Sequence, residues 1–147
     1  EICACLVGSE MCIRDRFISD IIWRFVMLNC LFVGIGGFIG AVLRYLIGLV
    51  SIKNPAGFPV NTFLINAFGA LAIGIIAALA AKNDNLDARL VLLLKVGICG
   101  GFTTFSTFSL ETAQLLKSGS TAIAILYAVC SVVVCVAAAF LPQAVIK

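Results

Sequence analysis

The chain has 147 residues, of which 63% are hydrophobic and only 12% are charged, and its formal net charge is +3. Soluble globular domains carry about 25% charged residues, so this composition is typical of a membrane protein and leaves no room for a soluble catalytic domain. The small positive charge argues against nucleic acid as a partner, and the absence of histidine removes the commonest general base and transition-metal ligand.

Residues 1–26 differ from the rest of the chain. They hold four of the seven acidic residues and three of the ten basic ones, without a sustained hydrophobic period. The run CLVGSEMCIRDR resembles translated sequencing-adaptor scars. We therefore predict that residues 1–26 are a non-native or disordered leader, and that the native domain comprises residues 27–147. The alternative is an interfacial segment anchored by Trp23 and Phe25.

Four apolar runs are each close to the length of about 20 residues that a bilayer requires. They predict an all-α membrane protein with transmembrane helices at about residues 29–50, 60–81, 90–117 and 122–141. The first carries the small-xxx-small pair Gly36 and Gly40, which favours close helix packing in lipid. Near its end, Arg44 is either an interfacial anchor or a charge facing a water-filled vestibule.

The second run places Thr62 and Asn66 on one helix face, because they are four residues apart. An asparagine inside a membrane helix needs a hydrogen-bond partner. Two interpretations stay open: the amide bonds to a neighbouring helix, or it offers its N–H₂ group to a permeating anion.

The third run contains the stretch GICGGFTTFSTFSLE, residues 97–111. Glycines and β-branched threonines disfavour a continuous helix, so we expect a break near the middle of the membrane. Irregular backbone at that depth requires burial in protein or a watery cavity. Phe105 and Phe108 share a face beyond the expected break. Glu111, an acidic residue in an apolar run, is a functional candidate.

The fourth run carries a weakly polar stripe formed by Tyr127, Ser131 and Cys135. Excluding Lys95, the basic residues from Met27 onward divide three against three between the two sides of the membrane. This balance gives no positive-inside preference and predicts an antiparallel homodimer with dual topology.

A central break in two inverted copies would direct freed carbonyls from both chains at one point. Carbonyl oxygens suit a small hard cation, and the absence of a carboxylate pair favours a monovalent one. Phenylalanine ring edges are positive, so Phe105 and Phe108 can line an anion path. Amide and hydroxyl donors would replace the water shell of a small, strongly hydrated anion.

Three stretches, GGFIGAVLRY, FPVNTFLINAFGALAIG and GICGGFTTFSTFSLE, resemble in order and spacing the signatures of the bacterial fluoride channel family (CrcB, or Fluc). The resemblance covers about residues 27–147. It implies an antiparallel homodimer in the bacterial inner membrane that passively exports fluoride and so lowers its cytoplasmic concentration, without enzymatic chemistry.

The resemblance also assigns residues. Backbone carbonyls of Gly100 and Thr103 would hold a structural sodium ion at the dimer centre. The fluoride path would be lined by seven residues: Phe105, Phe108, Asn66, Thr62, Ser131, Tyr127 and Arg44. Two positions depart from the family pattern. Asn61 replaces a glycine common before the threonine, and Cys135 replaces a hydroxyl common one turn after Ser131.

Two other functions compete with the channel. A small four-helix proton-coupled multidrug exporter shares the length and dual topology, but it needs an acidic residue in its first helix, which is absent here. A non-transporting subunit would use the glycines and hydroxyls for packing alone.

Overall fold

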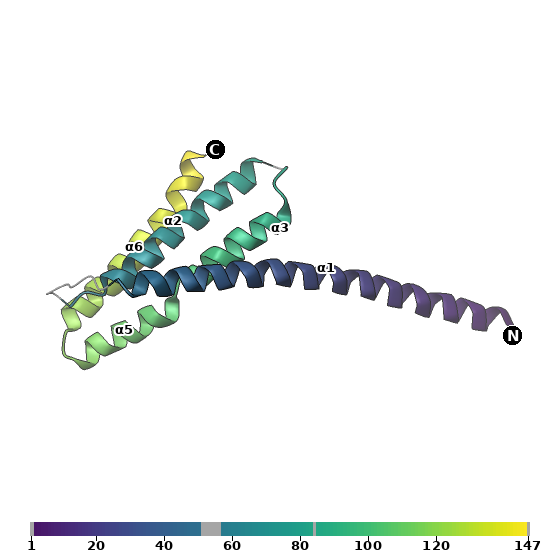
Figure 1. Ribbon diagram of the computed structural model, residues 1–147, viewed down its shortest axis with the longest axis horizontal. Helices are drawn as coiled ribbons and strands as arrows, with labels where there is room; N and C mark the ends of the chain where they lie inside the picture. The colour runs from purple at the N-terminus through teal and green to yellow at the C-terminus, as the bar shows by residue number, and fades with distance from the viewer. Residues whose placement is uncertain (1, 51–56, 84, 147) are drawn as a thin grey trace. The chain divides into compact units, whose positions relative to one another are not determined.

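The computed structural model describes residues 2–50, 57–83 and 85–146, and their side chains from residue 23 onward. Every regular element in this part of the chain is helical (Figure 1). The elements are α1 (Ile2–Gly48), α2 (Val60–Lys82), α3 (Ala88–Val91), the π-helix η1 (Leu92–Cys99), α4 (Gly100–Phe102), α5 (Phe105–Lys117) and α6 (Thr121–Val145).

Among the described residues, four stretches are long and apolar enough to cross a membrane: Trp23–Gly48, Val60–Lys82, Ala88–Lys117 and Thr121–Val145. The prediction of four transmembrane helices is therefore confirmed. The last helix runs to Val145, beyond the predicted end near residue 141, and includes Pro142 in its final turn. A proline there removes only one helical hydrogen bond.

The chain divides into two units, Glu1–Leu31 and Phe32–Lys147. In the first unit the helix begins at Ile2, well before the predicted start near residue 29, and the sequence has no proline before Pro55 to end it. The whole adaptor-like run, residues 5–16, lies outside the residues whose side chains are described. Trp23 and Phe25 are both exposed. The foreign origin of residues 1–26 stays a prediction.

Within the second unit, glycines allow α1 to lie against the third span at backbone distance. A Cβ added to Gly36 would collide with the Leu93 carbonyl oxygen, and one added to Gly40 with the Ile98 carbonyl oxygen. On the facing side, a Cβ on Gly97 would lie 2.8 Å from the Gly36 Cα. The predicted close approach through small residues is confirmed.

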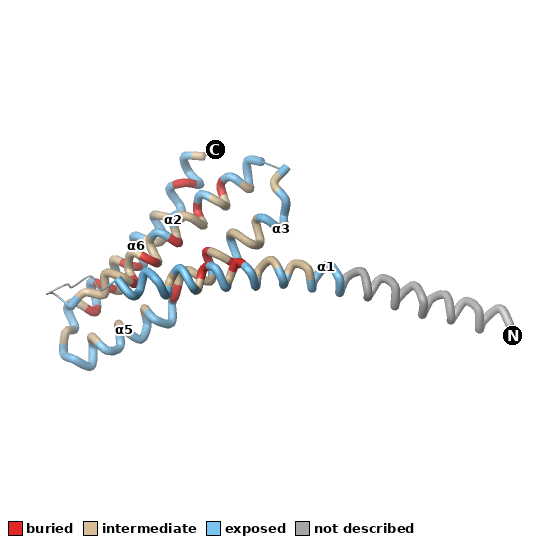
Figure 2. Tube along the Cα trace, in the orientation of Figure 1, coloured by how far each residue is buried: buried red, intermediate tan, exposed pale blue. Residues whose placement is uncertain are grey.

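Helices α2 and α6 lie side by side along their length (Figure 1). Gly74 makes this contact close, because a Cβ there would lie 2.5 Å from the Ala139 carbonyl oxygen. Buried positions occur along α2 and α6, while most other backbone is exposed or intermediate (Figure 2). Such a thin core is expected of a bundle whose outer surface meets lipid.

The third span is broken, as predicted. Helix α4 ends at Phe102, and the backbones of Thr103 (φ −78°, ψ 156°) and Thr104 (φ −149°, ψ 116°) are extended before α5 begins at Phe105. The break lies near the middle of Ala88–Lys117. The π-helical stretch Leu92–Cys99 that precedes it was not predicted.

Candidate functional site

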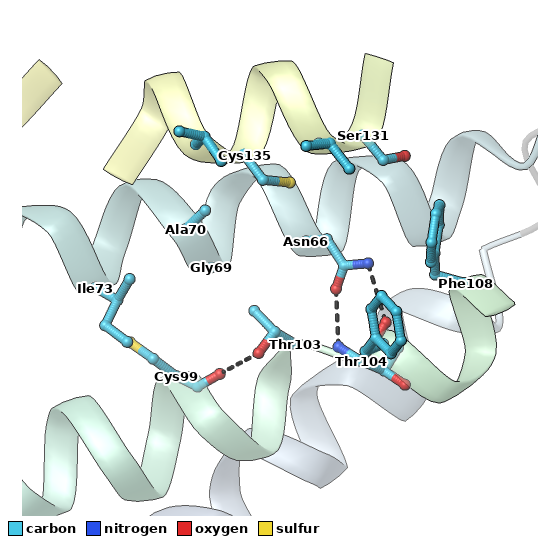
Figure 3. Close-up of a pocket in the computed structure, with 13 residues that line it drawn as sticks. Asn66, Gly69, Ala70, Ile73, Cys99, Thr103, Thr104, Phe108, Ser131 and Cys135 are labelled. Atoms are coloured by element: carbon cyan, nitrogen blue, oxygen red, sulfur yellow. Dashed lines mark hydrogen bonds between the residues drawn. The ribbon is translucent and has the colours of Figure 1, made fainter. Parts of the chain in front are cut away.

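A groove of about 380 Å³ lies beside the break in the third span (Figure 3). Side chains from α2, η1, α5 and α6 line it together with the two residues of the break. It contains five of the predicted site residues: Asn66, Thr103, Phe105, Phe108 and Ser131. The helix break thus brings distant parts of the sequence to one cavity.

The amide of Asn66 holds the backbone of the break. Its Nδ2 donates to the Thr104 carbonyl oxygen at 3.1 Å, and the Thr104 N–H donates to its Oδ1 at 2.8 Å (Figure 3). Of the two interpretations left open by the sequence, a hydrogen bond to a neighbouring helix is therefore present. The described residues occupy only one of the two N–H groups on Nδ2, so one donor remains for a ligand.

Thr104 caps α5. Its Oγ1 accepts a hydrogen bond from the backbone N–H of Thr107 at 3.2 Å, and it also donates to Thr107 Oγ1 at 3.1 Å. This is the usual contact of an N-cap threonine with the third residue of a helix. Thr104 is 8% exposed, so the cap works in a largely water-free environment, where an unpaired N–H is costly.

These two side-chain contacts affect the carbonyls before the break. In a continuous helix, the N–H of Thr104 would donate to the Gly100 carbonyl oxygen and that of Thr107 to the Thr103 carbonyl oxygen. Both donors are instead bonded to side-chain oxygens, on Asn66 and Thr104. Among the described residues, the carbonyls of Gly100 and Thr103 thus lack their usual helical partners.

Aromatic rings continue from the groove toward the start of α2. The ring centroids of Phe105 and Phe108 are 5.5 Å apart at 39°, and those of Phe108 and Tyr127 are 5.1 Å apart at 53°. Phe58, just before α2, packs edge-on against Tyr127 at 5.2 Å and 81°. Phe105 is 78% exposed at the open side of the groove.

Thr62 and Tyr127 converge on Glu111 outside the groove. Thr62 Oγ1 donates to Glu111 Oε1 at 2.7 Å, and the Tyr127 hydroxyl donates to Oε2 at 2.8 Å. The carboxylate thus joins α2, α5 and α6 through charge-assisted hydrogen bonds. It also faces a second cavity of about 380 Å³, lined by Gly57, Pro59, Glu111, Gln114, Leu115 and Ser118.

Ser131 is buried at the groove, and its Oγ has no hydrogen-bond partner among the described residues. Cys135 follows one turn later on the same wall, as the predicted stripe on the fourth helix requires. Arg44 is half-buried on α1 and lines neither cavity. Gly100 borders open space, because a Cβ added to it would have no atom of the described residues within 4 Å.

A model of the family described as CrcB-like protein, Camphor Resistance (CrcB), matches residues 31–143 of this chain. The chain belongs to the CrcB family.

Curated relatives at 41–47% identity support the family membership. A fluoride-specific ion channel FluC of Chlorobaculum tepidum is 47% identical over 69% of this chain and 81% of its own length. The protein of the same description from Hyphomonas neptunium is 47% identical over 78% of this chain and 92% of its own. The protein of the same description from Ruminiclostridium cellulolyticum is 41% identical over 82% of this chain and 94% of its own length.

The CrcB match includes every residue that lines the two cavities. Two contributors were missed from the sequence, the cap Thr104 and the ring of Phe58. Threonine is one of the residue types preferred at a helix N-cap, and this was a weak signal for Thr104. The Phe-Pro pair preceding the second helix was the corresponding signal for Phe58, although no spacing rule relates it to Tyr127.

Proposed function

We infer that this chain is a fluoride channel that passively exports fluoride across the bacterial membrane, without covalent chemistry. The observation that carries the inference is the similarity to relatives described as fluoride-specific ion channels, together with a CrcB family match that extends over all the groove residues. A multi-pass membrane protein with four spans and polar groups in a groove suits this function.

The groove offers hydrogen-bond donors that can replace the water shell of a fluoride ion. Ser131 contributes a buried, unpaired hydroxyl, and Asn66 one remaining N–H. A buried donor without a partner costs free energy, and a bound anion removes that cost. The rings of Phe105 and Phe108 add positive edges. Thr62 and Tyr127, held by Glu111, continue the predicted path beyond the groove, and Arg44 would attract anions from a vestibule.

The chain would work as an antiparallel homodimer in the lipid bilayer. Three observations support this proposal: the basic residues are balanced between the two sides, one chain has a thin core, and Phe105 is exposed at an open groove. A second copy would close the groove against lipid, which a path for a hydrated anion requires.

Sodium would be held at the dimer centre by the Gly100 and Thr103 carbonyls. The break fits such an ion, because these carbonyls lack their helical donors and no group of three or more histidine, cysteine or acidic side chains gathers in the described residues. When bound, the ion would supply positive charge that ties the two breaks together. The carbonyls of this chain would hold it without the help of a charged side chain.

The function is tested by fluoride efflux from liposomes that contain the purified protein. We expect fluoride, followed with a fluoride electrode, to leave far faster than chloride, followed with a chloride electrode, because the groove donors favour a small anion. Equal release of the two halides, or no release, would contradict the proposal. Transport of a cationic drug driven by a proton gradient would instead favour the multidrug exporter.

A further inference from the structure

Asn66 takes part in two proposed sites. It lines the groove of the fluoride path, and it holds the break that carries the proposed cation site. We propose that Asn66 and Thr104 are positioning residues for the cation site. Their side-chain oxygens take the two backbone N–H groups that would otherwise close onto the Gly100 and Thr103 carbonyls. The proposal rests on the proposed function and assigns these side chains a task that differs from anion binding.

The first step of the argument is the hydrogen-bond register. An α-helix bonds each N–H to the carbonyl four residues earlier, which pairs Thr104 with Gly100 and Thr107 with Thr103. The structure diverts both donors, the first to Asn66 Oδ1 at 2.8 Å and the second to Thr104 Oγ1 at 3.2 Å. The two diverted bonds release the two carbonyls assigned to the cation.

The second step is that the diversion needs a partner helix. Asn66 belongs to α2 and forms two hydrogen bonds with the backbone of one residue of the break, Thr104. Its amide donates to the Thr104 carbonyl and accepts from the Thr104 N–H. Gly69, one turn further along α2, makes room for this approach, because a Cβ there would collide with Thr103 Cγ2. The break is therefore maintained by α2 and by its own threonine together.

The third step is the expected effect of losing either side chain. With Asn66→Leu, the Thr104 N–H has lost its acceptor, and the acceptor that a helical register offers it is the Gly100 carbonyl. With Thr104→Val, which keeps the β-branched shape, the Thr107 N–H turns to the Thr103 carbonyl. In each case a proposed sodium ligand becomes occupied, and sodium binding weakens.

The experiment titrates the purified full-length protein in detergent with sodium chloride, with N-methylglucamine chloride keeping the ionic strength constant. A ligand that binds the native state raises the thermal unfolding midpoint. We expect Asn66→Leu and Thr104→Val to raise the sodium concentration needed for a given increase of this midpoint by about fivefold, the change that results when the free energy of a typical helix cap is lost from sodium binding. Thr104→Ser keeps the hydroxyl and should restore the wild-type titration.

The matched control is Thr112→Val. Thr112 is also a threonine of α5, but its Oγ1 donates to the Phe108 carbonyl at 2.7 Å and diverts no backbone N–H. Its titration should match the wild type. Wild-type titrations for Asn66→Leu and Thr104→Val would overturn the proposal, and so would a Thr104→Ser titration as weak as that of Thr104→Val.

A second measurement uses only the wild-type protein, so it does not depend on whether a variant folds. Carbonyl ¹³C shifts of Gly100 and Thr103, recorded by solid-state NMR on the wild type in lipid, should change when sodium is replaced by N-methylglucamine. Unchanged shifts at both carbonyls would overturn the proposal. Failure of the proposed function is recognised separately: it is a wild type that releases no fluoride, whatever the sodium titrations give.

Discussion

Glu111 accepts hydrogen bonds from two helices, and this makes Tyr127 structurally important as well as a predicted member of the fluoride path. The Tyr127 side chain is fully buried, its hydroxyl donates to Glu111 and its ring packs between Phe58 and Phe108. Removing the hydroxyl leaves the ring contacts in place. One atom can therefore be tested apart from the packing around it.

We predict that Tyr127→Phe lowers the free energy of unfolding by about 1.5–3 kcal/mol, because a hydrogen bond to a charged group is lost. The decrease should appear as a lower thermal midpoint in detergent. Tyr45→Phe is the matched control, since Tyr45 is 65% exposed on α1, and it should leave the midpoint unchanged. An equal effect of the two substitutions would exclude the bond to Glu111 as the cause.

At the scale of elements, glycine determines how closely α1 can lie against the third span. Neighbouring glycines differ sharply in this respect. A Cβ on Gly40 would meet the Ile98 carbonyl oxygen and lie 2.8 Å from the Phe102 nitrogen, whereas a Cβ on Gly37 would have no atom within 4 Å in the part of the chain that the structure describes. Both obstacles to the first Cβ are backbone atoms, which cannot turn away.

We therefore predict that Gly40→Ala destabilises the protein by about 1–3 kcal/mol through overpacking. Gly37→Ala should be neutral or slightly stabilising, because alanine lowers the backbone entropy of the unfolded chain. Thermal midpoints and the yield of folded protein in detergent measure both effects. Equal tolerance of the two substitutions would show that the helices can separate at little cost.

The elements were largely predictable because the bilayer requires length and apolarity, and both are visible in the composition of each span. The break was predictable too, since glycines and threonines cluster at residues 100–104. The start of α1 near residue 2 was not predictable, because the helix extends that far only through the absence of helix-ending residues. Nor was the cap at Thr104, since hydrogen-bond partners depend on how α2 meets the break. The groove needed three-dimensional packing, although five of its residues were predicted.

For the molecule as a whole, the family match begins at residue 31, and both cavities lie in the unit Phe32–Lys147. The proposed function therefore depends on residues that lie beyond the predicted leader. A chain begun at Met27 still has 22 residues up to Gly48, sufficient for the span of about 20 residues that a bilayer needs.

We predict that a chain starting at Met27 releases fluoride from liposomes at the full-length rate per protein, with the same thermal midpoint. Mass spectrometry of the protein expressed from its own genome checks the related prediction that the native chain begins there. A native N-terminus upstream of Met27 would contradict the leader hypothesis, and slower release by the shortened chain would show that residues 1–26 contribute to transport.

The break in the third span also separates partial charges. Helix dipoles place about half a positive charge at an N-terminus and half a negative charge at a C-terminus. Because the break ends η1–α4 and begins α5 within two residues, it sets a negative helix end beside a positive one. A stretch without a charged side chain would thereby favour the proposed cation on one side and an anion on the other, and the two ions could lie near each other in lipid without an ion pair between side chains.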